Sequence, residues 1–495
     1  MKHATSDAFS RRQFLAASAL ALGATGCLGD HEPAAPRVNP PLTEKPNIIV
    51  FLPDSLRADR IGVHGFELPV SPALDEFAQQ AYVFEQCHTQ ATWTKPSIAS
   101  LFTGVPPWVH EAGLGIHGHY NHHKGEAQVL RDDFALLAEE LELAGYATAW
   151  FLENGVIASE SLGFRRGMNH FEHDAQFNMP AQMRAIIQWM HANQDRPFFV
   201  FVHFVDPHYP FTPADSTYET VHGTAPALAL EGMNSEDRDF CTAYMENPAR
   251  LRGDEGRVNL EGKSAAVMDH IQRLYAAEIR GIDHQFSRLT GFLERTGLLD
   301  KSVVAYISDH GEAFGEHGVY YHMQPPYVHQ THVPLIVRMP GQTLQQRVPE
   351  TVALYDLYST FLAFAGLTPA DYVQAQPLFT PTGTLAVDKN RTVISVQDGL
   401  RPYPDKWVYG ITEGEKKLII DQHKNTLEAY NLRTDPMEKN NLVANGSLPP
   451  ALDGLRTHFE HTYARGRKQA KRFGKPAWTT EEQDMREAME ALGYL

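Results

Sequence analysis

The chain has 495 residues, enough for two or three hydrophobic cores, and only three cysteines, which excludes a small disulfide-stapled domain. With 43% hydrophobic and 21% charged residues, the composition is that of a globular protein and not of a disordered chain. The formal net charge of −17 argues against a nucleic-acid partner, because such a surface repels a polyanion. Twenty-five histidines favour a metal site.

The first 27 residues have the layout of an export signal. Arg11 and Arg12 precede an apolar, alanine-rich stretch that ends at Ala24 and is too short to span a bilayer. The paired arginines resemble a twin-arginine signal, and Cys27 resembles the lipid-bearing cysteine of a bacterial lipoprotein. Residues 28–45 contain four prolines among polar residues and are expected to form an extended tether. These features predict an exported protein, either periplasmic or anchored to the bacterial envelope through Cys27.

Strands alternate with helices between residues 46 and 367. Short apolar runs predict buried parallel strands at 47–52, 146–151, 198–205 and 303–307. Apolar residues at helical spacing predict helices at 132–145 and 265–296. Polar clusters follow the strands, so the expected fold is α/β, with a mostly parallel sheet between helices and a site beyond the carboxyl ends of the strands.

The remaining segments differ from this alternating pattern. Residues 211–263 have poor periodicity and are expected to form an insertion near the mouth of the site. After residue 367 the predicted strands are shorter, with examples at 392–396 and 417–420. We expect a catalytic domain over 46–367 and a smaller C-terminal α+β subdomain over 368–495, with a helical tail from about residue 481.

Four polar residues are the strongest candidates for a chemical site. Asp54 follows the first predicted strand, Asp309 and His310 follow the strand at 303–307, and Thr94 lies in a loop that feeds a helix. Parallel strands bring such residues to one edge of the sheet, and a cation relieves the repulsion between two carboxylates there. The pattern therefore predicts a cation beside the carboxylates of Asp54 and Asp309, with Thr94 and His310 as further candidates for the same site.

Several motifs resemble the sulfatase family of the alkaline phosphatase superfamily, and they occur in the family's order along nearly the whole mature chain. They begin at Pro46-Asn47 through Gly62, at Thr94-Lys95-Pro96-Ser97 through Gly104, and at Ser308-Asp309-His310-Gly311 through Gly318, and continue through His332-Val333-Pro334, Asp356 to Thr360 and Tyr430 to Leu442. The resemblance implies a large α/β domain with a smaller C-terminal sheet domain. It also implies a metal-dependent hydrolase of sulfate or phosphate esters.

The nucleophile motif departs from the family pattern. Most sulfatases have Cys-x-Pro-Ser-Arg, whose Cys, or a Ser in its place, is oxidised to formylglycine, whereas this chain has Thr94 at the first position and Ile98 at the last. Oxidation of a threonine would give a ketone, so no formylglycine is expected and Thr94 is predicted to attack directly as the nucleophile. Lys95 or Arg57 could supply the charge of the missing arginine if the geometry allows.

The resemblance also assigns the metal and further catalytic residues. One divalent ion is expected on Asp54, Thr94, Asp309 and His310, and the imidazole favours Mn²⁺ or Zn²⁺, with Ca²⁺ as the alternative. His208 matches a position that touches the oxyanion of the substrate. His317 and His332 match other pocket positions, with protonation of the leaving alcohol as their expected role.

Two other functions stay open from the sequence. One is an envelope transferase of the phosphoethanolamine type, although those enzymes usually carry several membrane helices. The other is an inactive binding lipoprotein with the same fold. The expected partner is a small-molecule, glycan or lipid ester substrate, without nucleic acid and with a membrane only through Cys27. Whether Cys87 and Cys241 form a disulfide is also open.

Overall fold

The computed structural model describes residues 41–113, 126–253, 257–397, 407–444, 446–474 and 477–480, together with Glu487 and Leu492. The predicted export signal with Cys27, most of the predicted tether and nearly all of the predicted tail from residue 481 lie outside this part of the chain. None of the helices in the described part combines the length and the apolar character that a membrane crossing requires.

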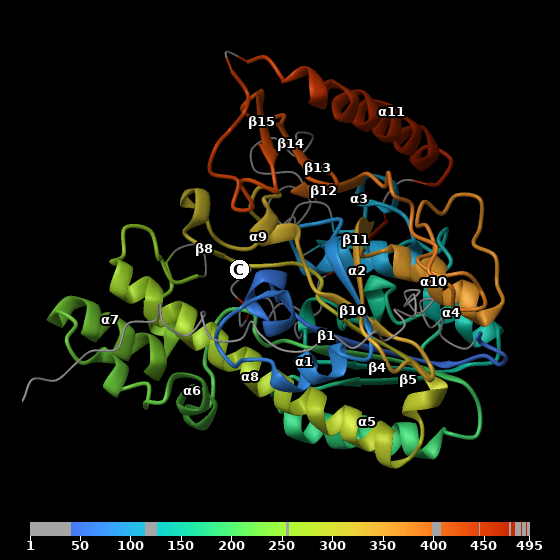
Figure 1. The fold of residues 1–495 in the computed structure, drawn as a ribbon, viewed down its shortest axis with the longest axis horizontal. Coiled ribbons are helices and arrows are strands. Elements are labelled where there is room, and N and C mark those ends of the chain that lie inside the picture. Colours follow the sequence, from blue (N-terminus) through green and yellow to red (C-terminus); the bar gives the residue numbers. More distant parts are fainter. Residues whose placement is uncertain are drawn as a thin grey trace, which may run out of the picture. The chain divides into compact units, whose positions relative to one another are not determined.

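An eight-stranded sheet forms the centre of the part between residues 46 and 367, in the order β11-β2-β10-β7-β1-β6-β4-β5 (Figure 1). β10 runs antiparallel to both of its neighbours, and the other adjacent pairs are parallel. The strands are β1 Asn47–Pro53, β2 Tyr82–His88, β4 Ala147–Leu152, β5 His170–His173, β6 Phe198–Phe204, β7 Ser302–Ile307, β10 Leu335–Arg338 and β11 Gln346–Ala353. The predicted mostly parallel sheet is confirmed.

Helices cover both faces of this sheet (Figure 1). Ile49 and Phe51 of β1 belong to the core on one face, which includes residues of α1, α5 and α8, whereas Ile48 and Val50 belong to the core on the other face, with α2, α4 and α10. The bounds are α1 Pro72–Ala78, α2 Thr94–Thr103, α4 Leu137–Leu143, α5 Met179–Ala192, α8 Ala265–Arg295 and α10 Asp356–Ala365. Burial on both faces explains why the strand is a continuous apolar run and not an alternating one.

The segment 211–263 is more regular than its sequence suggests. It contains α6 Asp215–His222 and α7 Ser235–Glu246, and α6 packs against the long helix α8. Short elements elsewhere are α3 Pro107–His110 and α9 Val328–Thr331, with the paired strands β3 Glu126–Val129 and β16 Ala477–Thr480, and β8 Ala313–Phe314 and β9 Tyr320–Tyr321.

A four-stranded antiparallel sheet follows the large sheet in the chain, in the order β12-β13-β14-β15, and α11 Asp453–Ala470 comes after it (Figure 1). Its strands are β12 Val393–Gln397, β13 Val408–Glu413, β14 Lys416–Asp421 and β15 Thr426–Asn431. The edge strand β12 contacts the loop before α2, because Val396 donates to the carbonyl of Gln90 at 2.9 Å and accepts from the amide of Thr92 at 3.2 Å. The smaller sheet thereby supports the segment that leads to Thr94.

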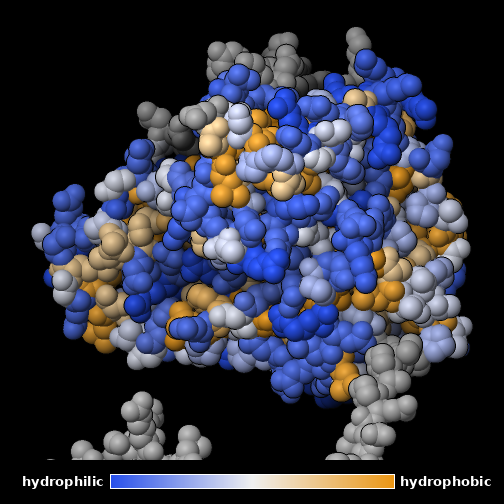
Figure 2. Space-filling model, turned by 45° about the horizontal axis from the view of Figure 1, so that its top comes forward, coloured by the Kyte–Doolittle hydropathy of each residue, from blue (hydrophilic) through white to orange (hydrophobic). Residues whose placement is uncertain are grey.

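The two described cysteines are not paired. Both are buried as free thiols, with Cys87 in the core on the α2 face of the sheet and Cys241 in the core on the α8 face. The face of the molecule in Figure 2 is mostly hydrophilic, and its hydrophobic residues form small, separate patches.

Candidate active site

Asp54 lies directly beyond the carboxyl end of β1 and is completely buried. The next residue, Ser55, has a φ of 61°, a left-handed conformation that is unusual for a side-chain-bearing residue. This turn lets the amide of Ser55 donate to Oδ1 of Asp309 at 3.2 Å, while its hydroxyl donates to Oδ1 of Asp54 at 3.0 Å. Ser55 therefore joins the two carboxylates that the sequence predicts to meet.

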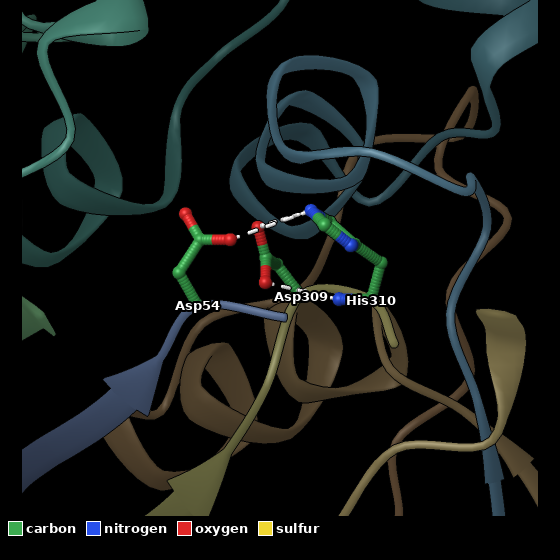
Figure 3. Close-up of side chains that lie close together, drawn as sticks. All are labelled: Asp54, Asp309 and His310. Carbon is green, nitrogen blue, oxygen red and sulfur yellow. Dashed lines mark hydrogen bonds and ion pairs between the residues drawn. The ribbon is translucent and has the colours of Figure 1, made fainter. Parts of the chain in front are cut away.

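Asp309 and His310 follow β7 and lie beside Asp54 (Figure 3). The Nδ1 atom of His310 donates to the carbonyl of Gly311 at 2.9 Å, so Nε2 is the ring nitrogen that is placed to bind a metal ion. Nε2 lies 3.4 Å from Oδ1 of Asp54 and 3.5 Å from Oδ2 of Asp309. Such an orientation of the ring is typical of a metal-binding histidine.

The donor set fits a divalent cation. Asp54, Asp309 and His310 each offer a ligand atom within 4.8 Å of the others, and all three side chains are buried. Oδ2 of Asp309 has no hydrogen-bond partner among the described residues. Burial and the neighbouring charge of Asp54 raise the pKa of Asp309, which is the expected result of two close carboxylates without a cation.

Thr94 is the first residue of α2 and is fully buried. Its Oγ1 donates toward Oδ2 of Asp54 at 3.3 Å and lies 3.3 Å from Nε2 of His310. Ser97, one turn later, donates to the carbonyl of Asp309 at 2.7 Å and holds the start of α2 against the loop after β7. The structure thus brings together all four residues that the sequence assigns to the metal site.

Two contacts of Asp54 were not predicted. Asn154, after β4, donates its Nδ2 to Oδ2 of Asp54 at 2.6 Å, and its Oδ1 accepts from the amide of Val156, which defines the orientation of the amide group. His203 of β6 lies 3.2 Å from the same carboxylate oxygen. Burial acts to raise the pKa of Asp54, but the hydrogen bond with His203 and the nearby histidines outweigh it, so the pKa lies well below its ordinary value.

His208, which the sequence analysis expects to touch the substrate, lies close to a second histidine that packs near His310. Its ring centroid is 4.6 Å from that of His322, and the ring of His322 is 4.8 Å from that of His310. Burial lowers the pKa of His208 to about 4, so the resting imidazole is neutral. His322 is also completely buried, and its Nδ1 lies 3.3 Å from Oε1 of Glu312. Neither His322 nor Glu312 was among the predicted site residues.

The other predicted catalytic residues make their described contacts elsewhere. Lys95 donates its Nζ to the carbonyl of Gln128 at 2.7 Å. His332 has its Nε2 2.9 Å from the carbonyl of Glu85, and its ring stacks on that of His88.

His317 is exposed and stacks on Tyr327 with a centroid distance of 3.8 Å. Its Nε2 lies 3.2 Å from the carbonyl of Met437. The described contacts of His332 and His317 are thus with residues other than the four around Asp54.

Comparisons with known proteins identify the family of the chain. The model of the Sulfatase family matches residues 46–367. The chain belongs to the Sulfatase family. It is 24% identical over 475 residues to an arylsulfatase of Clostridium perfringens, covering 83% of this chain and 93% of the relative. It is 22% identical over 499 residues to an N-acetylglucosamine-6-O-sulfatase of Bacteroides thetaiotaomicron, covering 85% and 86%.

Solved structures share the fold. A phosphonate monoester hydrolase of Agrobacterium radiobacter superposes with a TM-score of 0.65 at 18% identity, covering 86% of this chain and 96% of that one. A second protein, solved in complex with its substrate D-glucosamine-2-N,6-O-disulfate, also gives a TM-score of 0.65. It is 20% identical, and the match covers 90% of this chain and 100% of that one. The predicted sulfatase family, α/β fold and ester hydrolase class are confirmed, and the comparisons do not favour the transferase or the inactive binding protein.

Proposed function

We propose that this sulfatase-family protein hydrolyses sulfate or phosphate esters with Thr94 as a direct nucleophile. The observation that carries the proposal is the contact of one buried hydroxyl, Oγ1 of Thr94, with both Asp54 and His310 at 3.3 Å. A nucleophile within hydrogen-bond reach of groups that can accept its proton has the arrangement needed for covalent catalysis. The relatives that are named sulfatases or phosphonate monoester hydrolases support the same class of ester.

The first step joins Thr94 to the substrate. Its Oγ attacks the sulfur or phosphorus atom, the bond to the alcohol oxygen breaks, and the hydroxyl proton passes to solvent. The product is a sulfo- or phospho-threonine ester. Water then attacks this ester, releases sulfate or phosphate and restores the hydroxyl of Thr94.

Asp54, Asp309 and His310 would hold one divalent ion, with the hydroxyl of Thr94 beside it. When bound, the ion supplies Lewis-acid polarisation of the ester and stabilises the charge that develops in the transition state. Ser55 orients both carboxylates, and Asn154 holds Oδ2 of Asp54. A set of oxygens with one imidazole favours Mn²⁺ or Zn²⁺, with Ca²⁺ as the alternative.

We assign contact with the substrate to His208 and His322 and not to His317 or His332. The rings of His208, His322 and His310 lie in a row at 4.6 and 4.8 Å. An anionic ester beside His208 would raise the low pKa of that imidazole and let it donate a proton to the leaving alcohol. The alcohol part would be a small molecule or a glycan, and the predicted export would place the reaction in the bacterial envelope.

The test is a set of matched assays on the purified protein. After removal of metal and reloading with Mn²⁺, Zn²⁺ or Ca²⁺, turnover of p-nitrophenyl sulfate, phosphate and a bis-p-nitrophenyl diester is compared with that of Thr94→Ala. We expect turnover of at least one ester and a loss of about 10³-fold or more in Thr94→Ala. Equal activity of the two proteins would exclude Thr94 as the nucleophile, and no turnover with any metal would contradict the hydrolase assignment for these esters.

A further inference from the structure

His203 is a polar residue on a buried face of the central sheet. Phe199 and Phe201, at alternate positions of the same strand β6, belong to the core on the α2 face. Because side chains alternate along a strand, the imidazole of His203 lies on that face too, and it is completely buried. An apolar side chain would fit this place without any polar atom to satisfy, so packing alone does not explain a histidine here.

The register of the sheet places His203 beside Asp54. β6 pairs with β1 in parallel, with His203 opposite Leu52, and the amide of Asp54 donates to the carbonyl of Phe204 at 3.0 Å. The imidazole thereby reaches the carboxylate at the end of the neighbouring strand, with Nε2 3.2 Å from Oδ2 of Asp54. The low pKa of Asp54 means an ionised carboxylate, which only accepts hydrogen bonds, so Nε2 of His203 is the donor.

A second N–H donor reaches the same oxygen from the next strand. The amide of Glu153 donates to the carbonyl of His203 at 2.9 Å, which fixes the end of β4 beside β6. Asn154, the next residue, donates its Nδ2 to Oδ2 of Asp54 at 2.6 Å. Two N–H donors at the ends of adjacent strands thus converge on Oδ2, and together they limit the rotation of the carboxylate.

The other oxygen of Asp54 faces the remaining ligands of the proposed ion. Oδ1 lies 3.4 Å from Nε2 of His310, and Figure 3 shows this oxygen directed toward Asp309 and His310 and the second oxygen directed away from them. Three buried side chains must offer their ligand atoms to one ion. A rotation of the Asp54 carboxylate would separate its ligand atom from the other two.

The ring of His203 contacts Asp54 although its other nitrogen gains nothing. Nδ1 is buried and has no hydrogen-bond partner among the residues that the structure describes. A buried polar atom without a partner costs stability. The contact of Nε2 with Asp54 is therefore the interaction that explains a histidine at this position of the strand.

We propose that His203 is a positioning residue of the metal site. Its Nε2–H donor holds Oδ2 of Asp54, so that Oδ1 stays directed at the other two ligands. This inference rests on the proposed function of the same site, because it requires the divalent ion. Hydrogen bonds to a metal-binding carboxylate orient it, and their loss typically weakens metal affinity by about 10- to 100-fold.

The experiment titrates the metal-stripped protein with Mn²⁺ and with Zn²⁺ in a calorimeter. His203→Leu removes the donor, whereas the amide of His203→Gln keeps an N–H group that can reach Oδ2. His270→Leu is the control, because His270 is another buried histidine and its described ring contact is with Tyr218. We expect His203→Leu to raise the dissociation constant by about 10- to 100-fold, His203→Gln to restore most of the affinity, and His270→Leu to leave it unchanged. If His203→Leu and His270→Leu bind the metals alike, the inference is wrong.

The calorimetry needs no ester, so it separates this inference from the proposed function. Weaker metal binding by His203→Leu, in a protein that turns over no ester, would contradict the hydrolase and retain the role of His203. Unchanged metal binding by His203→Leu, in a protein that turns over esters, would retain the hydrolase and contradict the role of His203. If the unmodified protein binds neither metal, the role of His203 is contradicted as well.

If His203→Leu does not fold, as judged by circular dichroism, the pair His203→Gln and His203→Asn decides. The amide nitrogen of glutamine takes the place of Nε2, whereas that of the shorter asparagine takes the place of Nδ1 and does not reach Oδ2 of Asp54. We expect His203→Asn to bind the metals about tenfold or more weakly than His203→Gln. Equal dissociation constants of these two variants would overturn the proposal.

Discussion

Oδ2 of Asp309 has no hydrogen-bond partner among the described residues, and it lies 3.5 Å from Nε2 of His310. The buried carboxylates of Asp309 and Asp54 repel each other, and a cation held by both of them and by Nε2 would remove the repulsion. This relationship is the strongest indication that the site is built for a metal ion.

Removal of Asp309 should therefore abolish the stabilisation that a metal provides. A ligand that binds only the folded state stabilises by about 2.7 kcal/mol at a concentration of 100 times its dissociation constant. We expect Mn²⁺ or Zn²⁺ to raise the Tm of the metal-stripped protein but not that of Asp309→Ala. Asp195→Ala, at an exposed position, is the control. If the metal raised the Tm of Asp309→Ala as much as that of the unmodified protein, Asp309 would not be a metal ligand.

Gly311, directly after His310, cannot carry a side chain in the present backbone. A Cβ atom there would lie 2.1 Å from the carbonyl oxygen of His329. Gly311→Ala should shift the loop and lose the hydrogen bond that sets the ring of His310, at a cost of about 1–3 kcal/mol of stability. Denaturant unfolding and metal titration measure the two effects. Gly297→Ala is unsuitable as a control because of its positive φ, whereas Gly454→Ala adds a Cβ in open space.

A buried ion pair lies within the C-terminal part of the chain, between β14 and the segment after β15, and its lysine also contacts α9. Lys417 of β14 and Glu438 are both fully buried, with Nζ 3.9 Å from Oε1, and Nζ also donates to Thr331 at 3.4 Å. Lys417→Met would leave an uncompensated carboxylate, so we expect a loss of about 3–5 kcal/mol of unfolding free energy. Lys416→Met, at the exposed neighbouring position, should change it little.

The double variant Lys417→Met, Glu438→Gln tests the cause of that loss. It removes both charges, and much of the lost stability should return. If the double variant is as unstable as Lys417→Met, the packing of the lysine stem and not the unpaired charge accounts for the effect.

Asp283 of α8 gives a pH dependence that is separate from the site. Its carboxylate accepts from the amides of Ala73 and Leu74 and pairs with Arg280, yet burial raises its pKa to about 6. Between about pH 4 and pH 6 the folded protein keeps a proton that the unfolded chain has lost. The contribution of Asp283 to stability therefore falls as the pH rises through this range.

The comparison with Asp283→Asn isolates this contribution. The unfolding free energy of the unmodified protein minus that of the variant should fall by up to about 3 kcal/mol from pH 4 to pH 6. Urea unfolding at several pH values measures it. A difference that rises with pH would mean that the pKa of Asp283 is lowered in the folded protein.

The central strands and the metal ligands were predictable because their signals are local. β1 and β7 are apolar runs that end at Asp54 and at Ser308-Asp309, and the carboxyl ends of parallel strands meet at one edge of a sheet. Thr94 could be joined to them only through the family resemblance, since no spacing in the sequence connects it to Asp54.

Some residues of the site were not predicted, because their sequence patterns also occur at positions with a purely structural role. His203 interrupts the apolar strand β6, and its polar side chain within a buried strand was the available clue. Asn154 follows β4 in what the sequence shows as an ordinary loop, and only its contact with Asp54 brings it to the site. Long-range contacts of this kind depend on how loops fold over the sheet.

The most direct test of the central claim is to identify the covalent intermediate. The metal-loaded protein is mixed with a turned-over ester, quenched in acid, digested and analysed by mass spectrometry. We expect one sulfuryl or phosphoryl group on the peptide that contains Thr94, located at that residue by fragmentation and absent from Thr94→Ala. A labelled residue other than Thr94, or turnover by Thr94→Ala at the rate of the unmodified protein, would contradict direct attack by Thr94.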